Sequence, residues 1–157
     1  MELELMPGVG VSSFRFGMSA EEARGAVRDG GAFLIGGRDA DPGQVTLSHD
    51  ESGMVVVLGF TKGELSGVEL FRFRREDCGV RVLLDGLDVF RTPSEELLAR
   101  FAERGYAVEE DDLGFDALPE LGVAFANVSG YEFPVDEDGD PVCFDYVLAA
   151  TEITPGR

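Results

Sequence analysis

Two stretches of the chain share one order of hydrophobic and polar positions: a short alternating strand followed by an amphipathic helix. In Leu87–Tyr106, apolar residues first alternate around Asp88, as in a half-buried strand. Apolar residues then recur at helical spacing at Leu97, Leu98 and Phe101. This pattern predicts a strand that leads directly into a helix.

The predicted helix carries start and stop signals. Thr92 is the expected N-cap, Pro93 fits the first helical position, and Glu95 completes a capping box. Gly105 suits the left-handed conformation that ends a helix. These signals predict a helix between Pro93 and Gly105.

An earlier stretch, Phe14–Gly31, repeats this order. Ser19 is the expected N-cap, Glu22 completes the box, and glycines end the helix at Gly30 and Gly31. The two predicted caps are separated by roughly seventy residues, and a fixed internal period is a primary sign of repeat architecture. Coincidence is the alternative explanation, because a capped helix after a strand is common.

Strand-like segments follow each helix. After the first helix, Val45–His49 alternates, and Met54–Phe60 is apolar nearly throughout, as in a central strand buried on both faces. In the next strand, Leu65–Arg74, Phe71 and Phe73 are expected to point inward while the arginines between and after them point outward. These segments predict an antiparallel meander.

We therefore predict an α+β fold in which residues 1–157 form one compact body. It is expected to consist of two related units, with pseudo-repeat 1 at about 1–75 and pseudo-repeat 2 at about 79–154, each made of one helix and an antiparallel meander. Met1–Met6 alternates and is expected to form an edge strand.

The composition supports a folded core and indicates the compartment. Apolar residues make up 44% of the 157 positions and aromatic residues 10%, which disfavours disorder. No segment is long and apolar enough for a membrane span, and the acidic first residues do not form a signal peptide. The two cysteines, Cys78 and Cys143, form no disulfide framework and are expected to be reduced. A cytoplasmic location is expected.

The net charge of −18 restricts the classes of partner. Phosphates of nucleic acids and anionic membrane surfaces are repelled by such a surface, so neither is an expected partner. A basic protein is favoured, because opposite charge accelerates encounter. Lys62 is the only lysine, and the arginine-rich composition allows an alternative in which the acidity reflects genome composition or salt adaptation.

The densest acidic run is the first candidate site. It contains Glu109, Glu110, Asp111 and Asp112, and we predict that it contacts a basic partner with the adjacent apolar residues Leu113 and Phe115. The alternative is a solvated loop, the usual state of a charged run.

The one basic cluster is the second candidate site. Arg72, Arg74 and Arg75 are predicted to bind an anion or a partner. The alternative is that they pair with the acidic residues around them.

No catalytic, metal or cofactor motif is present. His49 is the only histidine and has no accompanying nucleophile motif. Asp136–Asp140 lacks the ligand spacing of a calcium loop and is expected to be a solvated hairpin tip. The pair Gly8 and Gly10 precedes a strand, whereas a dinucleotide-binding loop follows one. We predict no catalytic residues, no metal and no cofactor.

The N-terminal stretch has a family resemblance. It reads Gly8-Val9-Gly10, a short strand, and then Phe16-Gly17-Met18-Ser19-Ala20-Glu21-Glu22. This resembles the opening of many small uncharacterised bacterial proteins, and a similar entry occurs in the folds of the outer-membrane assembly lipoprotein BamE and the beta-lactamase inhibitory protein. That inhibitor is a tandem repeat of helix-plus-sheet units and binds its target on a concave sheet. Because the inhibitor's disulfides and secretion signal and the lipoprotein cysteine are missing here, the resemblance implies only a tandem-repeat binding scaffold.

These observations predict a non-catalytic, acidic protein-binding module, and an immunity or inhibitor protein against a basic partner is the sharper form of that hypothesis. Two alternatives stay open. One is a small-molecule-binding protein or enzyme with a pocket between the two units. The other is a structural protein whose acidity has no role in recognition.

Overall fold

The computed structural model describes residues 1–31, 33–36, 43–110, 114–128 and 133–151. Two sheets form the fold, one of eight strands in the order β10-β11-β12-β13-β7-β6-β5-β4 and one of five in the order β3-β2-β1-β8-β9. The strands are β1 (Glu2–Met6), β2 (Gly10–Val11), β3 (Phe14–Arg15), β4 (Leu34–Ile35), β5 (Gln44–His49), β6 (Met54–Thr61), β7 (Glu64–Phe71), β8 (Arg81–Leu84), β9 (Leu87–Asp88), β10 (Glu109–Glu110), β11 (Asp116–Leu118), β12 (Val123–Ala126) and β13 (Tyr146–Ala150). The helices are α1 (Ala20–Gly30), α2 (Ser94–Glu103) and the short 3-10 helix η1 (Pro119–Leu121).

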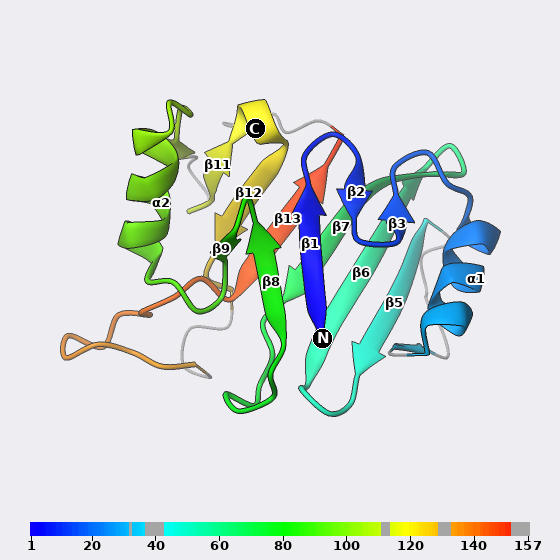
Figure 1. The fold of residues 1–157 in the computed structure, drawn as a ribbon, viewed down its shortest axis with the longest axis horizontal. Coiled ribbons are helices and arrows are strands. Elements are labelled where there is room, and N and C mark those ends of the chain that lie inside the picture. The colour runs from blue at the N-terminus through cyan, green and yellow to red at the C-terminus, as the bar shows by residue number, and fades with distance from the viewer. Residues whose placement is uncertain (32, 37–42, 111–113, 129–132, 152–157) are drawn as a thin grey trace.

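The two sheets are stacked, with the helices at opposite ends of the stack. Figure 1 shows the five-stranded sheet in front of the eight-stranded sheet, α2 on the β12 side and α1 beside β5. The ring of Phe101 in α2 stacks on Phe125 of β12, with 6.4 Å between centroids. The hydrophobic core therefore lies between the eight-stranded sheet and a layer made of the smaller sheet and both helices. The prediction of an α+β fold with antiparallel strands is confirmed in this form.

Helix α1 begins as its sequence predicts. The side chain of Ser19 accepts from the Glu22 amide, and the Glu22 carboxylate accepts from the Ser19 amide, so both halves of the capping box are present. Gly31 ends the helix with φ of 68°, a left-handed conformation that costs glycine little. Ala23 and Val27 form its buried stripe.

Helix α2 begins one residue later than predicted. Pro93, not Thr92, is the N-cap, and no side chain caps the helix, so the predicted capping box at Thr92 and Glu95 is wrong. The residue before a proline is disfavoured in the helical conformation, and here the proline itself is extended, with ψ of 138°. The apolar stripe is confirmed, because Leu97 and Phe101 are fully buried.

Each sheet combines strands from both expected units. In the eight-stranded sheet β7 pairs with β13, and in the five-stranded sheet β1 pairs with β8. Strand β1 is consequently central rather than at an edge, because β2 takes its other side. The predicted meander through β5, β6 and β7 is present, but it is part of a larger sheet than the sequence predicts.

The chain has no helix long and apolar enough to cross a membrane in the part that the structure describes.

Candidate functional site

Alternate side chains of the eight-stranded sheet point away from the core, and together they form what we call the outer face. One row of directly paired residues across this face contains Ala126, Tyr146, Phe71, Val55 and Ser48. The next row contains Ala124, Leu148, Glu69, Val57 and Thr46. Within the described ranges, none of these ten residues belongs to the core cluster, so the sheet presents a second, separate apolar surface.

A line of aromatic rings crosses the outer face. The ring of Phe71 meets Tyr146 edge to face, with centroids 5.2 Å apart, and Tyr146 meets Phe115 in the same way at 5.8 Å. Phe71 and Phe115 are half-buried, while Tyr146 between them is 6% exposed. Edge-to-face pairs of this kind fix the orientation of rings, so the line is a preorganised surface.

Glu69 lies beside this aromatic line. Its Oε1 accepts a hydrogen bond of 2.6 Å from the Tyr146 hydroxyl on the neighbouring strand. Burial raises the pKa of the Tyr146 phenol far above its ordinary value, and the hydrogen bond to Glu69 raises it further. Tyr146 is therefore a proton donor to Glu69 throughout the neutral range.

A cavity of about 270 Å³ adjoins the outer face. Its apolar walls are Val55, Val57, Phe71 and Phe133, and its polar walls come from Arg72, Arg74, Asp145 and the backbone at Gly53. The aromatic line thus ends at a depression in the surface of the sheet, bordered by Phe71.

The predicted acidic site lies at one edge of this same sheet. Glu109 and Glu110 form β10, the edge strand next to β11, and both are exposed. Phe115 belongs to the aromatic line, as its contact with Tyr146 shows. Asp111, Asp112 and Leu113 lie outside the described residues. Charge and aromatic surface are therefore adjacent along the chain and on the sheet.

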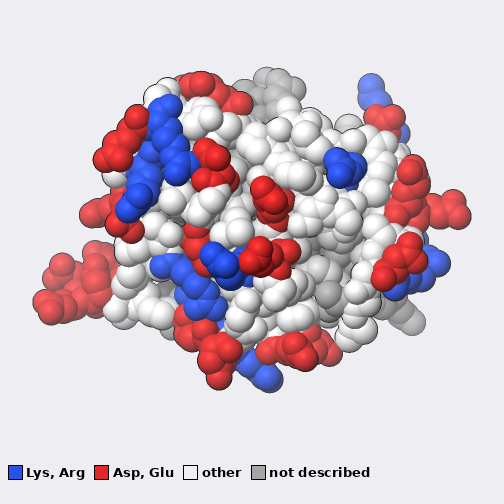
Figure 2. All heavy atoms as spheres, in the orientation of Figure 1, with Lys and Arg blue, Asp and Glu red and all other residues white. Residues whose placement is uncertain are grey.

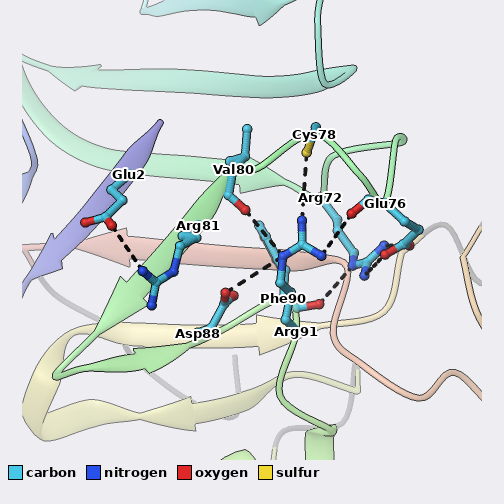
Figure 3. Close-up of polar contacts among 9 residues, drawn as sticks. All are labelled: Glu2, Arg72, Glu76, Cys78, Val80, Arg81, Asp88, Phe90 and Arg91. Carbon is cyan, nitrogen blue, oxygen red and sulfur yellow. Dashed lines mark hydrogen bonds and ion pairs between the residues drawn. The ribbon is translucent and has the colours of Figure 1, made fainter.

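Arg72 is placed differently from its expected position. Its side chain is buried, with 3% of its surface exposed. In this buried position Nε donates to the Phe90 carbonyl at 3.0 Å, and both Nη atoms donate to the Glu76 carboxylate (Figure 3). The guanidinium also lies over the rings of Phe73 at 4.5 Å and Phe133 at 5.2 Å. The hydrogen bond from Arg72 is the largest cause of the lowered pKa of Glu76.

Arg91 connects the linker Glu76–Gly79 to the five-stranded sheet. Figure 3 shows its guanidinium between the carbonyls of Val80 and Glu76, at 3.4 and 3.0 Å, with Asp88 at 3.9 Å. Burial raises the pKa of the Asp88 carboxyl, against the opposing charge of Arg91.

The two cysteines lie near this arginine. Cys78 Sγ is 3.9 Å from an Nη atom of Arg91, and Cys143 lines a cavity of about 240 Å³ together with Arg91 and Arg72. Both cysteines are free, and burial raises the pKa of the Cys143 thiol.

The three arginines of the predicted anion site occupy different environments. Arg74 and Arg75 are exposed, whereas Arg72 is buried against Glu76. The backbone amides of Arg74 and Arg75 both donate to the carbonyl of Ser52, which turns the two side chains away from the core. Arg74 and Arg72 both line the cavity beside the outer face.

His49 has a structural environment. It is 9% exposed, its Nδ1 lies 2.7 Å from the hydroxyl of Ser52, and its ring meets Phe33 edge to face. These contacts hold the turn between β5 and β6. Asp136–Asp140 forms an exposed turn, in which the Asp136 carboxylate accepts from the amides of Asp138 and Asp140.

On the side of the molecule opposite to the outer face, positive and negative charges are mixed. Figure 2, viewed from the side of the five-stranded sheet, shows acidic side chains interspersed with arginines, and one acidic group projecting at the tip of the loop between β12 and β13. This view contains no extended surface of a single charge sign.

Sequence reasoning missed the outer face because it placed the side chains of Phe71, Val55 and Val57 in the core. Phe71 is half-buried on the outer face and Arg72 is buried, the reverse of what was expected for these two residues, whereas Phe73 is buried and Arg74 is exposed as predicted. Val55 and Val57 were expected to be buried, but they are half-buried on the outer face, while Met54 and Val56 fill the core.

Comparisons with protein-family models, with curated proteins and with solved structures found no match to this chain.

Proposed function

We propose that the protein is a non-catalytic binding module that holds a basic protein on the outer face of its eight-stranded sheet. The observation that carries this proposal is the aromatic line of Phe115, Tyr146 and Phe71 beside the acidic edge strand β10. Aromatic residues are enriched where proteins bind one another, and they supply large contact area at low entropic cost.

The charge of the chain selects the kind of partner. A net charge of −18 attracts a basic surface over distances of about a Debye length and accelerates its encounter. Charge mainly sets the rate of association, whereas buried apolar contacts set the lifetime of the complex. The outer face supplies the apolar contacts, and Glu109 and Glu110 at its edge supply nearby negative charge.

An immunity or inhibitor protein against a basic toxin or enzyme is the specific form we favour. Such a protein needs a rigid surface and a charge opposite to that of its target. The outer face supplies the first, and the net charge of −18 supplies the second. The N-terminal resemblance to the beta-lactamase inhibitory protein supports a scaffold of this kind by analogy.

We also propose that the fold arose by tandem duplication. Each half of the chain contains a short strand, a helix and then a four-stranded meander, β4–β7 or β10–β13, and the meanders meet at their last strands. A twofold axis normal to the sheets would make both pairs of equivalent strands antiparallel. The β7–β13 pair is antiparallel but the β1–β8 pair is parallel, so no single axis of this kind relates both pairs. The proposed duplication has therefore diverged most in the five-stranded sheet.

Capture from the native host at low and high salt tests the binding function. The bait is the full chain, with Val57→Lys as the outer-face variant, because Val57 is half-buried in the middle of β6. Ser13→Lys is the matched control, since Ser13 is exposed in the turn between β2 and β3. We expect a basic partner to bind the wild type and the control, and to bind Val57→Lys at least tenfold more weakly.

Equal capture by both variants would contradict the use of the outer face. Failure to recover any basic protein at low salt would contradict the binding function itself. Unfolding midpoints of the three baits, measured in urea, separate a lost surface from a lost fold.

A small-molecule function is the second candidate, supported by one cavity. It measures about 420 Å³ and is lined from both halves of the chain, by Glu4–Pro7, Leu84, Asp85, Tyr106 and Leu121. Its apolar walls and the Glu4 carboxylate suit a small cationic, apolar ligand, while the Asp85 carboxylate already pairs with Arg104 at 2.7 Å. Amide shifts confined to these residues on addition of benzylamine would support it, and unchanged spectra would exclude this ligand class.

A further inference from the structure

Glu69 is a charged residue in an apolar part of the outer face. Its direct neighbours across the sheet are Leu148 on β13 and Val57 on β6, and the aromatic pair Tyr146 and Phe71 lies in the adjacent row. Glu69 itself is half-buried. Few water molecules can surround a carboxylate between such neighbours, so a hydrogen-bonding partner there is worth more than at an exposed site.

The carboxylate has unused acceptor capacity. A carboxylate accepts up to about four hydrogen bonds. In the described part of the chain, Glu69 receives one side-chain hydrogen bond, from Tyr146 to Oε1, and makes no ion pair. Tyr146 also fixes the orientation of the carboxylate, because its ring is held between Phe71 and Phe115.

A guanidinium group fits this arrangement better than other cations. Its planar fork donates two parallel hydrogen bonds to one carboxylate, and its faces stack on aromatic rings. The ring of Phe71 lies one row from Glu69 on the same strand, within reach of a group bound to that carboxylate. An ammonium group offers a point charge without the matching plane.

We infer that Glu69, oriented by Tyr146 and flanked by Phe71, is the point at which the outer face recognises an arginine side chain of a basic protein partner. This inference rests on the proposed binding function and specifies the chemistry of the partner. The net charge of −18 is complementary to such a partner.

Titration of the ¹⁵N-labelled full chain with N-acetyl-arginine amide tests the inference. We expect saturable shifts of the backbone amides of Glu69, Phe71 and Tyr146, with a dissociation constant on the order of 10 mM for this single side chain. N-acetyl-citrulline amide, which has the same shape without the charge, is expected to cause no such shifts. N-acetyl-lysine amide is expected to bind severalfold more weakly than the arginine probe.

Glu69→Gln is the decisive variant, because glutamine keeps an oxygen for the Tyr146 hydroxyl but loses the charge. We expect this variant to bind N-acetyl-arginine amide at least fivefold more weakly than the wild type does. Glu64→Gln is the matched control, since Glu64 begins the same strand and is exposed. Equal binding by Glu69→Gln and wild type, shifts scattered over the acidic surface, or no saturable shift would each overturn the inference.

The result is separable from the capture experiment. If Val57→Lys abolishes capture while the arginine probe fails, the outer face binds its partner by other contacts and only the role of Glu69 is wrong. If Val57→Lys captures the partner normally, the proposed face is wrong whatever the probe does.

Discussion

The hydroxyl of Tyr146 donates to Oε1 of Glu69 across neighbouring strands, 2.6 Å away, on the face of the sheet that points away from the core. Burial of the phenol, together with this hydrogen bond, raises its pKa far above the ordinary value of 10.0, so the folded protein holds it protonated. Because the folded pKa is raised, this contribution to stability is complete below about pH 10 and is lost as pH rises toward the folded pKa.

We predict that Tyr146→Phe removes this alkaline loss. At neutral pH the variant is expected to be less stable by about 1.5–3 kcal/mol, because a hydrogen bond to a charged group is lost. Above pH 10 the stabilities of the variant and the wild type should converge. Urea unfolding at a series of pH values measures this, and parallel curves for the two proteins would contradict it.

We predict that Arg72→Lys destabilises the fold although the charge is kept. Lysine cannot reproduce the bond from Nε to the Phe90 carbonyl or the two-pronged contact with Glu76. A loss of about 2 kcal/mol in the free energy of unfolding is expected. Arg75→Lys is the control, because Arg75 is exposed, and it should change stability by less than about 0.5 kcal/mol.

We predict that removing the hydroxyl residue at the start of each helix lowers stability by different amounts. Ser19→Ala removes both a cap oxygen and a capping box, and it is expected to cost about 1 kcal/mol. Thr92→Ala removes no cap, because Pro93 occupies that position, and it should cost less than about 0.5 kcal/mol. Thermal unfolding of the two variants measures the difference, and equal losses would contradict the observed start of α2.

We predict that reversing the charges of β10 slows binding without weakening the fold. Glu109→Lys combined with Glu110→Lys places positive charge at the edge of the sheet, where both side chains are exposed. The association rate with the captured partner is expected to fall and to depend less on salt. Stopped-flow measurements at two salt concentrations test this, with unfolding in urea as the control for stability.

The local elements were predictable where several signals agreed. At α1, the cap, the box, the apolar stripe and the terminal glycine all act within one helix, so the sequence near Ser19 was sufficient. The turn between β8 and β9 also agrees with its residues, because an Asp-Gly pair is typical of a tight hairpin and Asp85 and Gly86 adopt the positive φ values of one, 50° and 83°.

The candidate site was not predictable in the same way. Whether Val57 or Phe71 faces the core depends on which strand lies beside it, and that pairing joins segments far apart in the sequence. Apolar strands give no alternation from which to choose a side. The acidic run could be seen in the sequence. The aromatic line beside it could not, because predicting it requires the register that pairs Tyr146 with Phe71.

The parallel pairing of β1 with β8 imposes an order on folding. Strand β1, Glu2–Met6, can pair with β8 only after residues 81–84 have been synthesised. In the same way, β7 can pair with β13 only after the last strand has been synthesised. Closing such long loops costs entropy before any contact is gained, so high contact order and slow folding are expected. During synthesis the N-terminal half leaves the ribosome with both of its sheets incomplete. Two separately expressed halves should therefore acquire native structure only when they are mixed.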